Sequence, residues 1–114
     1  MDMILRNDAY TVPQYREELT YKDLEMDPYK RVCRLNGERV ALTPTEFSIL
    51  QVLLENRGRA VSAQELAELV WNDAFYISRS DSLAVHIRHL REKLDDTLKP
   101  FSYVKTVWGV GYAI

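Results

Sequence analysis

Apolar residues recur at helical spacing near the end of the chain, between Ser80 and Asp96. At about 100° per residue they share one face, which predicts a helix with one buried side. The residues of this stripe are Leu83, Ile87, Leu90 and Leu94. The opposite face starts with small residues and continues with Arg88 and His89. That slim, basic outline suits a DNA major groove, but a solvated charged face has the same pattern.

Two further helices are predicted upstream. Thr43-Pro44-Thr45-Glu46 supplies an N-cap, a proline at the first helical position and a glutamate that closes a capping box, and Ser62 with Glu65 repeats the box. The apolar stripes that follow are Phe47, Leu50, Leu53 and Leu54 in one helix and Leu66, Leu69 and Val70 in the next. The second helix ends near Trp71. A polar loop then leads to the helix of residues 80–96, which makes a helix-turn-helix with a longer turn than usual.

Alternating runs on either side of the helices predict strands. Four short runs precede them, and Asn36-Gly37 favours a hairpin between the last two, so a small antiparallel sheet is expected. The four runs are residues 19–21, 24–26, 30–35 and 38–42. After Pro100, residues 102–107 and 109–114 predict a final hairpin, here called the wing. Its tip can reach the DNA backbone or the minor groove beside the last helix.

Composition sets the class of protein. With 114 residues, 46% hydrophobic and 28% charged, the chain fits one globular domain, and no apolar run approaches the roughly 20 residues of a membrane span. Residues 1–18 have no clean period and are expected to form a linker or an N-terminal arm. They lack the pattern of a signal peptide, so we expect a cytoplasmic protein. Cys33, the single cysteine, is expected in the core.

Charge is unevenly distributed. Residues 79–114 hold six basic and four acidic residues, a local charge of +2, whereas the remainder carries −4 and the whole chain −2. A basic C-terminal part on an acidic body fits a protein that binds a polyanion with one face.

Three motifs carry a resemblance to a known family. They are LTPTEF at residues 42–47, VHIRHLREKL at residues 85–94 and KTVWGVGY at residues 105–112. With them, residues 19–114 resemble the DNA-binding effector domain of OmpR/PhoB-type response regulators, with a VanR-like flavour. The resemblance implies an α+β fold: a winged helix-turn-helix with an N-terminal antiparallel four-stranded sheet, three helices and a C-terminal β-hairpin wing. It implies no enzyme activity, no cofactor and no metal.

The same resemblance implies partners. We expect transcriptional regulation through sequence-specific binding of a head-to-tail dimer to direct-repeat double-stranded DNA. The loop before the last helix, with Asp73, Phe75 and Tyr76, is expected to contact RNA polymerase or to pin itself to the core. Family members normally carry an N-terminal receiver domain, which residues 1–18 are too short to form. We expect an effector domain from a longer regulator, reached by a sensor kinase only through its receiver, in preference to a receiver-less relative.

Candidate DNA contacts follow from the helical wheel and the resemblance. The base-edge candidates are Ala84, Val85, Arg88 and His89, and Arg88 could equally serve a phosphate. His89 stands where arginine is common. By resemblance alone, the phosphate candidates are Trp71, Ser82, His86, Arg91, Thr106 and Tyr112. Core packing is the alternative for Trp71, and packing against the last helix is the alternative for Tyr112.

The wing candidates are Lys105, Trp108 and Gly109. Many family members carry an arginine at the position of Trp108, inserted in the minor groove. Tryptophan cannot supply that charge, so Trp108 either stacks on a sugar or covers the core, while Lys105 supplies the charge. We expect a structural Trp108 and weaker minor-groove readout.

Two rival functions remain. A metal or catalytic site would use His86 and His89, but at this spacing they project about 60° apart and no further ligands accompany them. A winged-helix protein-interaction module without DNA binding would suit the acidic net charge. The position of Arg88 and Arg91 on the last helix disfavours it.

Overall fold

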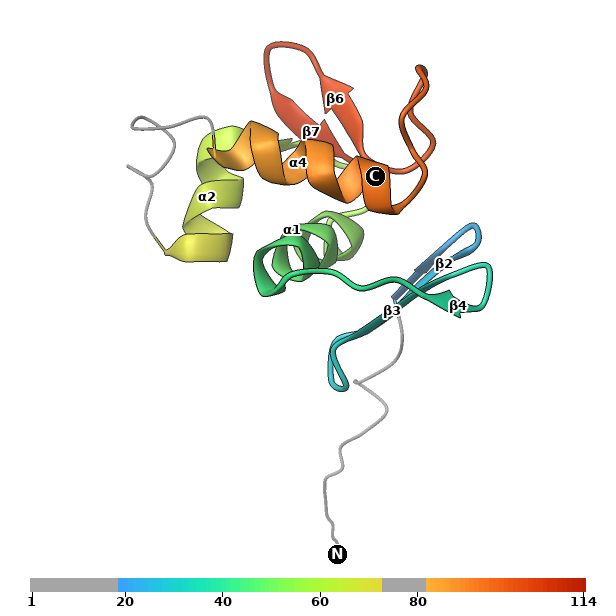
Figure 1. Cartoon of the computed structure of the whole chain (residues 1–114). Helices are drawn as coiled ribbons and strands as arrows, with labels where there is room; N and C mark the ends of the chain where they lie inside the picture. The colour runs from blue at the N-terminus through green and yellow to red at the C-terminus, as the bar shows by residue number, and fades with distance from the viewer. Residues whose placement is uncertain (1–18, 73–81) are drawn as a thin grey trace, which may run out of the picture.

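The computed structural model describes residues 19–72 and 82–114. These residues form three helices and two small sheets, with α1 (Pro44–Glu55) packed against α2 (Ala63–Trp71) and α4 (Ser82–Lys93) (Figure 1). None of these helices is long and apolar enough to cross a membrane. The predicted arm of residues 1–18 and the loop residues Asp73, Phe75 and Tyr76 lie outside the described residues.

The N-terminal sheet is antiparallel, in the order β1-β2-β3-β4. Its strands are β1 (Leu19–Tyr21), β2 (Leu24–Asp27), β3 (Val32–Leu35) and β4 (Glu38–Arg39). Asn36 and Gly37 both have positive φ, which confirms the predicted hairpin turn. The third strand starts two residues later than predicted. Asp27 accepts hydrogen bonds from the backbone N–H groups of Tyr29 and Lys30, so residues 28–31 form a turn.

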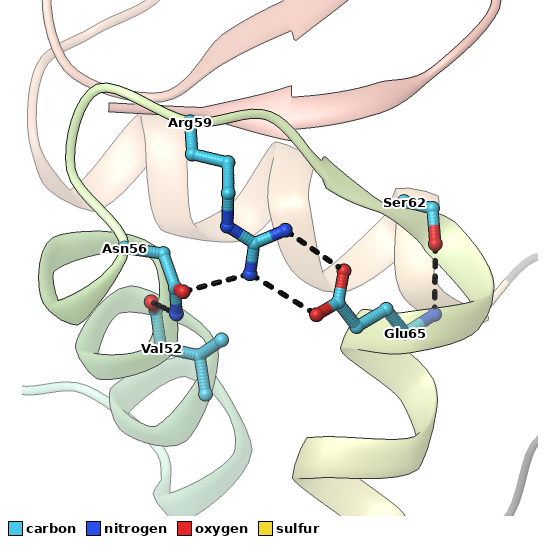
Figure 2. Close-up of polar contacts among 5 residues, drawn as sticks. All are labelled: Val52, Asn56, Arg59, Ser62 and Glu65. Atoms are coloured by element: carbon cyan, nitrogen blue, oxygen red, sulfur yellow. Dashed lines mark hydrogen bonds and ion pairs between the residues drawn. The ribbon is translucent and has the colours of Figure 1, made fainter.

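The predicted capping box of α1 is confirmed in both directions. The Glu46 N–H donates to Thr43 Oγ1 at 3.1 Å, and the Thr43 N–H donates to Glu46 Oε1 at 2.9 Å. At α2 one half forms, because Ser62 Oγ accepts from the Glu65 N–H. Among the described contacts, the Glu65 carboxylate is bound by Arg59 at 3.1 and 3.3 Å instead of closing the box (Figure 2). Arg59 also donates to Asn56 Oδ1, which joins the end of α1 to the start of α2.

The core lies between the N-terminal sheet and the three helices. All four residues of the stripe predicted in residues 80–96 are buried, and so is Cys33. The stripe predicted for α2 is wrong at Leu69, which is 56% exposed. Leu66 and Ala67 are buried and Val70 is half-buried, and this arc spans about 100° of the helix. Leu69 lies about 60° beyond it and therefore faces water.

The second sheet forms the wing and has the order β5-β7-β6. Its strands are β5 (Val61–Ser62), β6 (Lys105–Val107) and β7 (Gly111–Ala113). A side chain at residue 111 would meet the carbonyl oxygen of Val61, 2.0 Å from an ideal Cβ, so the close pairing of β5 and β7 requires Gly111.

Both wing strands are shorter than predicted, and Asp96 explains where β6 begins. Its carboxylate is buried and accepts hydrogen bonds from the N–H groups of Ser102, Tyr103 and Val104 at 2.6, 3.0 and 2.9 Å. These three donors therefore bond to a side chain instead of joining a strand ladder. The architecture as a whole confirms the predicted α+β winged helix-turn-helix.

Candidate nucleic-acid interface

The outer face of α4 is accessible where the sequence predicts base contacts. Ala84 and Arg88 are exposed, Val85 is 39% exposed and His89 is half-buried. The opposite face is packed into the core through Leu83 and its stripe. The solvent-facing side of α4 thus carries small side chains in its first half and basic ones in its second half. Packing against α1 holds the helix in place.

Arg88 and His89 are in contact with each other. The Arg88 Nη2 lies 3.3 Å from His89 Nε2. A guanidinium has donors only, so a hydrogen bond between these two atoms requires His89 Nε2 to be the acceptor. The two side chains form one polar unit on the exposed face, able to offer both a positive charge and a ring edge.

His86 and Trp71 also come together. Their ring centroids are 5.7 Å apart, which connects α4 to the end of α2. Trp71 is half-buried and packs against the core, as the alternative interpretation anticipates. Ser82 is the first residue of α4, at the helix end where backbone N–H groups attract anions, and its side chain lies outside the described structure. Phosphate binding by these three residues stays a prediction.

Arg91 joins α4 to the wing. Its Nε donates to the Val104 carbonyl at 2.9 Å and its Nη2 donates to Thr106 Oγ1 at 2.8 Å. The guanidinium also lies 3.7 Å from the Phe101 ring and 5.9 Å from the Tyr112 ring. Burial lowers the pKa of Arg91, while Tyr112 and Asp96 oppose that shift. Three predicted phosphate contacts, Arg91, Thr106 and Tyr112, therefore form one cluster that holds the wing against α4.

The wing residues separate into an anchored base and an exposed tip. Lys105 Nζ lies 3.3 Å from the Tyr21 hydroxyl, and this hydrogen bond is the main cause that lowers the pKa of Tyr21. Trp108 is 86% exposed, so the expectation that it covers the core is wrong. Residues 108–110 form the turn between β6 and β7 at the end of the hairpin (Figure 1), and the Trp108 side chain there is left in water.

Sequence patterns missed several residues that position this surface. Asp96 anchors the chain leading into β6, and Lys93 ends α4 with an ion pair to Glu46. Neither contact follows from a local sequence pattern. Asp96 binds residues 102–104 across a loop, and Lys93 of α4 binds Glu46 of α1. Among the described residues, no three His, Cys, Asp or Glu side chains gather as a metal site would require. Burial raises the pKa of the Cys33 thiol to about 11, which makes it unreactive at neutral pH.

The arrangement of α1, α2, α4 and the wing defines a winged-helix domain. Residues 37–114 match the family described as "Transcriptional regulatory protein, C terminal", so the chain belongs to that family, in its OmpR/PhoB type. It is 44% identical over 101 residues to the regulatory protein VanR of Enterococcus faecium, covering 89% of this chain and 44% of VanR. The chain thus spans less than half of that relative.

Solved structures agree in fold. The DNA-binding domain of Klebsiella pneumoniae RstA, in complex with the RstA box, has a TM-score of 0.78 and 30% identity, covering 86% of this chain and 96% of that one. The DNA-binding domain of CpxR from E. coli has a TM-score of 0.75 and 28% identity, covering 86% and 95%. The predicted resemblance to OmpR/PhoB-type regulators with a VanR-like flavour is confirmed.

Proposed function

We propose that this domain regulates transcription by binding double-stranded DNA in a sequence-specific manner, with α4 in the major groove. The observation that carries the proposal is the exposed face of α4, which runs from Ala84 and Val85 to the Arg88–His89 unit. Small side chains let a helix approach base edges, and arginine bonds guanine or phosphate. The comparison with RstA supports it, because that domain is similar in fold and was solved with its DNA box.

Each candidate contact has a role in this proposal. Val85 and Ala84 contact thymine methyl groups, His89 reads a base edge, and Arg88 serves a base or a phosphate. Phosphate oxygens on either side are bound near the N-terminus of α4 and at the base of the wing. The candidates for these phosphate contacts are Trp71, Ser82, His86, Arg91, Thr106 and Tyr112.

The wider assembly is proposed on the family resemblance. Two copies bind head to tail on a direct repeat, and Asp73, Phe75 and Tyr76 contact RNA polymerase. A sensor kinase acts only through a receiver domain in the whole regulator. The domain itself performs no catalysis and works in the cytoplasm, the compartment that holds its DNA.

The test is site selection followed by a binding titration. Random duplexes are selected on the full chain, and fluorescence anisotropy then measures affinity for the selected duplex over a salt series. We expect the selected sites to form a direct repeat. We also expect the logarithm of the affinity to fall linearly with the logarithm of the salt concentration, with a gradient called the salt slope below. Absence of binding at low salt would favour the rival function, a winged-helix module whose partner is a protein.

A further inference from the structure

A surface groove of about 480 Å³ lies between α1 and α2. One end of it is closed by the polar network of Figure 2, in which the Arg59 guanidinium joins Asn56 to Glu65. The residues that line the groove are Ser48, Gln51, Val52, Glu55, Asn56, Arg59, Glu65 and Leu69. Both helices therefore contribute side chains to one hollow on the surface.

The groove contains apolar surface from both helices. Leu69 of α2 is 56% exposed, and Val52 of α1 is half-buried on the other side of the groove. A single exposed leucine is ordinary in a soluble protein. A leucine that lies in a groove beside a second apolar side chain is instead the arrangement that receives an apolar side chain from a partner helix.

Hydrogen bonds hold the groove open in the free protein. The Arg59 Nη2 donates to Asn56 Oδ1 at 2.7 Å and to Glu65 Oε2 at 3.1 Å. The Asn56 side chain donates in turn to the Val52 carbonyl at 2.7 Å. This network sets the spacing between the end of α1 and the start of α2. A partner therefore finds a formed site, which lowers the cost of binding.

The charge of the two helices selects the kind of partner. Together α1 and α2 contain four glutamates, and neither helix contains a lysine, arginine or histidine. Glu46 is buried, and Arg59 pairs with Glu65. Among the described contacts, Glu55 only accepts a hydrogen bond from Gln51, so its charge has no cationic partner. The groove therefore suits a partner that is apolar on one side and basic at its edge.

The groove faces away from α4. On a helical wheel of α1, its groove residues occupy the arc opposite the buried residues, which pack into the core with α4. Trp71 of α2 contacts His86 of α4, and Leu69 lies about 160° from Trp71 around that helix. If α4 occupies DNA, as in the proposed function, the groove stays free for another molecule.

We propose that the groove between α1 and α2 docks a basic amphipathic helix of a partner protein. An apolar side chain of that helix packs against Leu69 and Val52, and a lysine or arginine pairs with Glu55. Two packed helices accept the side-chain ridge of a third helix between them. The groove runs from Ser48 to Glu55, about 10 Å along α1, and takes roughly two turns of the partner. It is separate in sequence from the loop proposed to contact RNA polymerase.

The experiment uses a synthetic basic helix as the probe. A fluorescein-labelled peptide of leucine and lysine at helical spacing, about four turns long, is titrated with the full chain without DNA. An acidic peptide with glutamate in place of lysine is the control. We expect the basic peptide to bind about tenfold or more tightly than the acidic one, and more weakly as salt rises. Equal binding of the two peptides would overturn the inference.

Two substitutions test the groove, each with a matched control. Leu69→Gln should weaken binding of the basic peptide about tenfold or more, and Leu98→Gln, at a leucine that is 82% exposed after α4, less than about twofold. Glu55→Lys should weaken it about 3- to 10-fold. Glu38→Lys makes the same change of net charge at an exposed residue of β4 and should have a smaller effect. Equal losses within either pair would overturn the inference.

Backbone amide chemical shifts locate the bound peptide. We expect the largest changes at residues 48–56 and 65–69, and changes confined to α4 or the wing would overturn the inference. Sedimentation of the chain alone tests for a second copy. Self-association that is lost in Leu69→Gln would assign the groove to that copy and also overturn the inference.

DNA binding separates this inference from the proposed function. Leu69→Gln should bind the selected duplex within about twofold of wild type, because its side chain faces away from α4 and is exposed. A Leu69→Gln protein that lost DNA and peptide binding together would overturn a separate role for the groove. Failure of the wild-type chain to bind any duplex would refute the proposed function, whereas the peptide titration tests the groove without DNA.

Discussion

Lys93, the last residue of α4, places its Nζ 2.6 Å from Oε1 of Glu46 in the first turn of α1. The same oxygen accepts the N–H of Thr43, so one buried carboxylate both caps α1 and holds the C-terminal end of α4. A buried carboxylate needs such donors, because losing one leaves an unpaired charge away from water. The capping-box pattern predicts the contact between Thr43 and Glu46. The contact between Lys93 and Glu46 joins residues 47 positions apart, so no local pattern predicts it.

This ion pair predicts an acid-sensitive contribution to stability. Burial raises the pKa of Glu46, but hydrogen bonds from Lys93 and from the Thr43 backbone outweigh it and leave the pKa below the usual glutamate value. A lowered pKa in the folded state stabilises the fold above the unfolded pKa of about 4.3, and this contribution is lost as pH falls through the folded value. Urea unfolding from pH 7 to pH 3 should show wild type losing more free energy than Glu46→Gln.

The matched control for that experiment is Glu92→Gln, which changes an exposed glutamate beside Lys93. At pH 7, Glu46→Gln should cost about 1–3 kcal/mol and Glu92→Gln less than about 0.5 kcal/mol. Parallel pH profiles for wild type and Glu46→Gln would show that the pair adds nothing to the acid response.

Asp96 gives a second stability prediction. Its carboxylate accepts three backbone N–H groups, and asparagine would turn an amide donor toward some of them. Asp96→Asn should therefore lower the free energy of unfolding by about 1–3 kcal/mol. Asp95→Asn is the neighbouring control: Asp95 is exposed and has a φ of 56°, which asparagine tolerates well. Equal stabilities of the two variants in chemical unfolding would count against the anchoring role.

The two arginines of α4 should respond differently to loss of charge. Arg88 is exposed, so Arg88→Gln should leave stability within about 0.5 kcal/mol and, if Arg88 holds a phosphate, lower the salt slope of DNA binding by about 0.9. Arg91→Gln removes the donors to Val104 and Thr106 and should cost about 1–3 kcal/mol of stability, with a smaller change in slope. If Arg91→Gln kept full stability and lowered the salt slope of DNA binding, Arg91 would be a phosphate contact and not an anchor of the wing.

His89 should affect the choice of sequence. Its half-buried ring lies beside Arg88 on α4, and the proposed function assigns it a base edge. His89→Ala should cost roughly 1–3 kcal/mol at one base pair of the selected site and little on random duplex. Competition titrations with single-position variants of the site measure this. An equal loss on every sequence would assign His89 to the backbone instead.

Local patterns were enough to predict the elements of this fold. The buried stripe around Ile87, the cap at Thr43 and the turn at Asn36-Gly37 each depend on residues within a few positions of one another. The exact extent of β6 could not be predicted, because Asp96 takes N–H donors that a strand pattern assigns to a ladder. The exposure of Leu69 could not be predicted either. How wide a face of a helix is buried depends on the elements that pack against it, which the spacing of apolar residues does not show.

The sequence predicted where the candidate DNA-binding surface lies on α4, but not the hydrogen bonds that join this surface to the wing. The exposed face of α4 follows from the helical wheel, which depends on spacing alone. The bonds from Arg91 to Val104 and Thr106 cross 13 and 15 residues and depend on where the wing folds back. Trp108 was misassigned for the same reason: the sequence pattern places it in a turn, and only the fold shows that the turn extends beyond the core.

The most direct test of sequence-specific binding is the ratio of affinities for the selected duplex and a random duplex, measured by anisotropy at one physiological salt concentration. Specific regulators bind their sites roughly 10³-fold or more tightly than other DNA. We predict a ratio of at least that size for wild type, reduced by His89→Ala. A ratio near one, or no binding to either duplex, would contradict DNA recognition by α4.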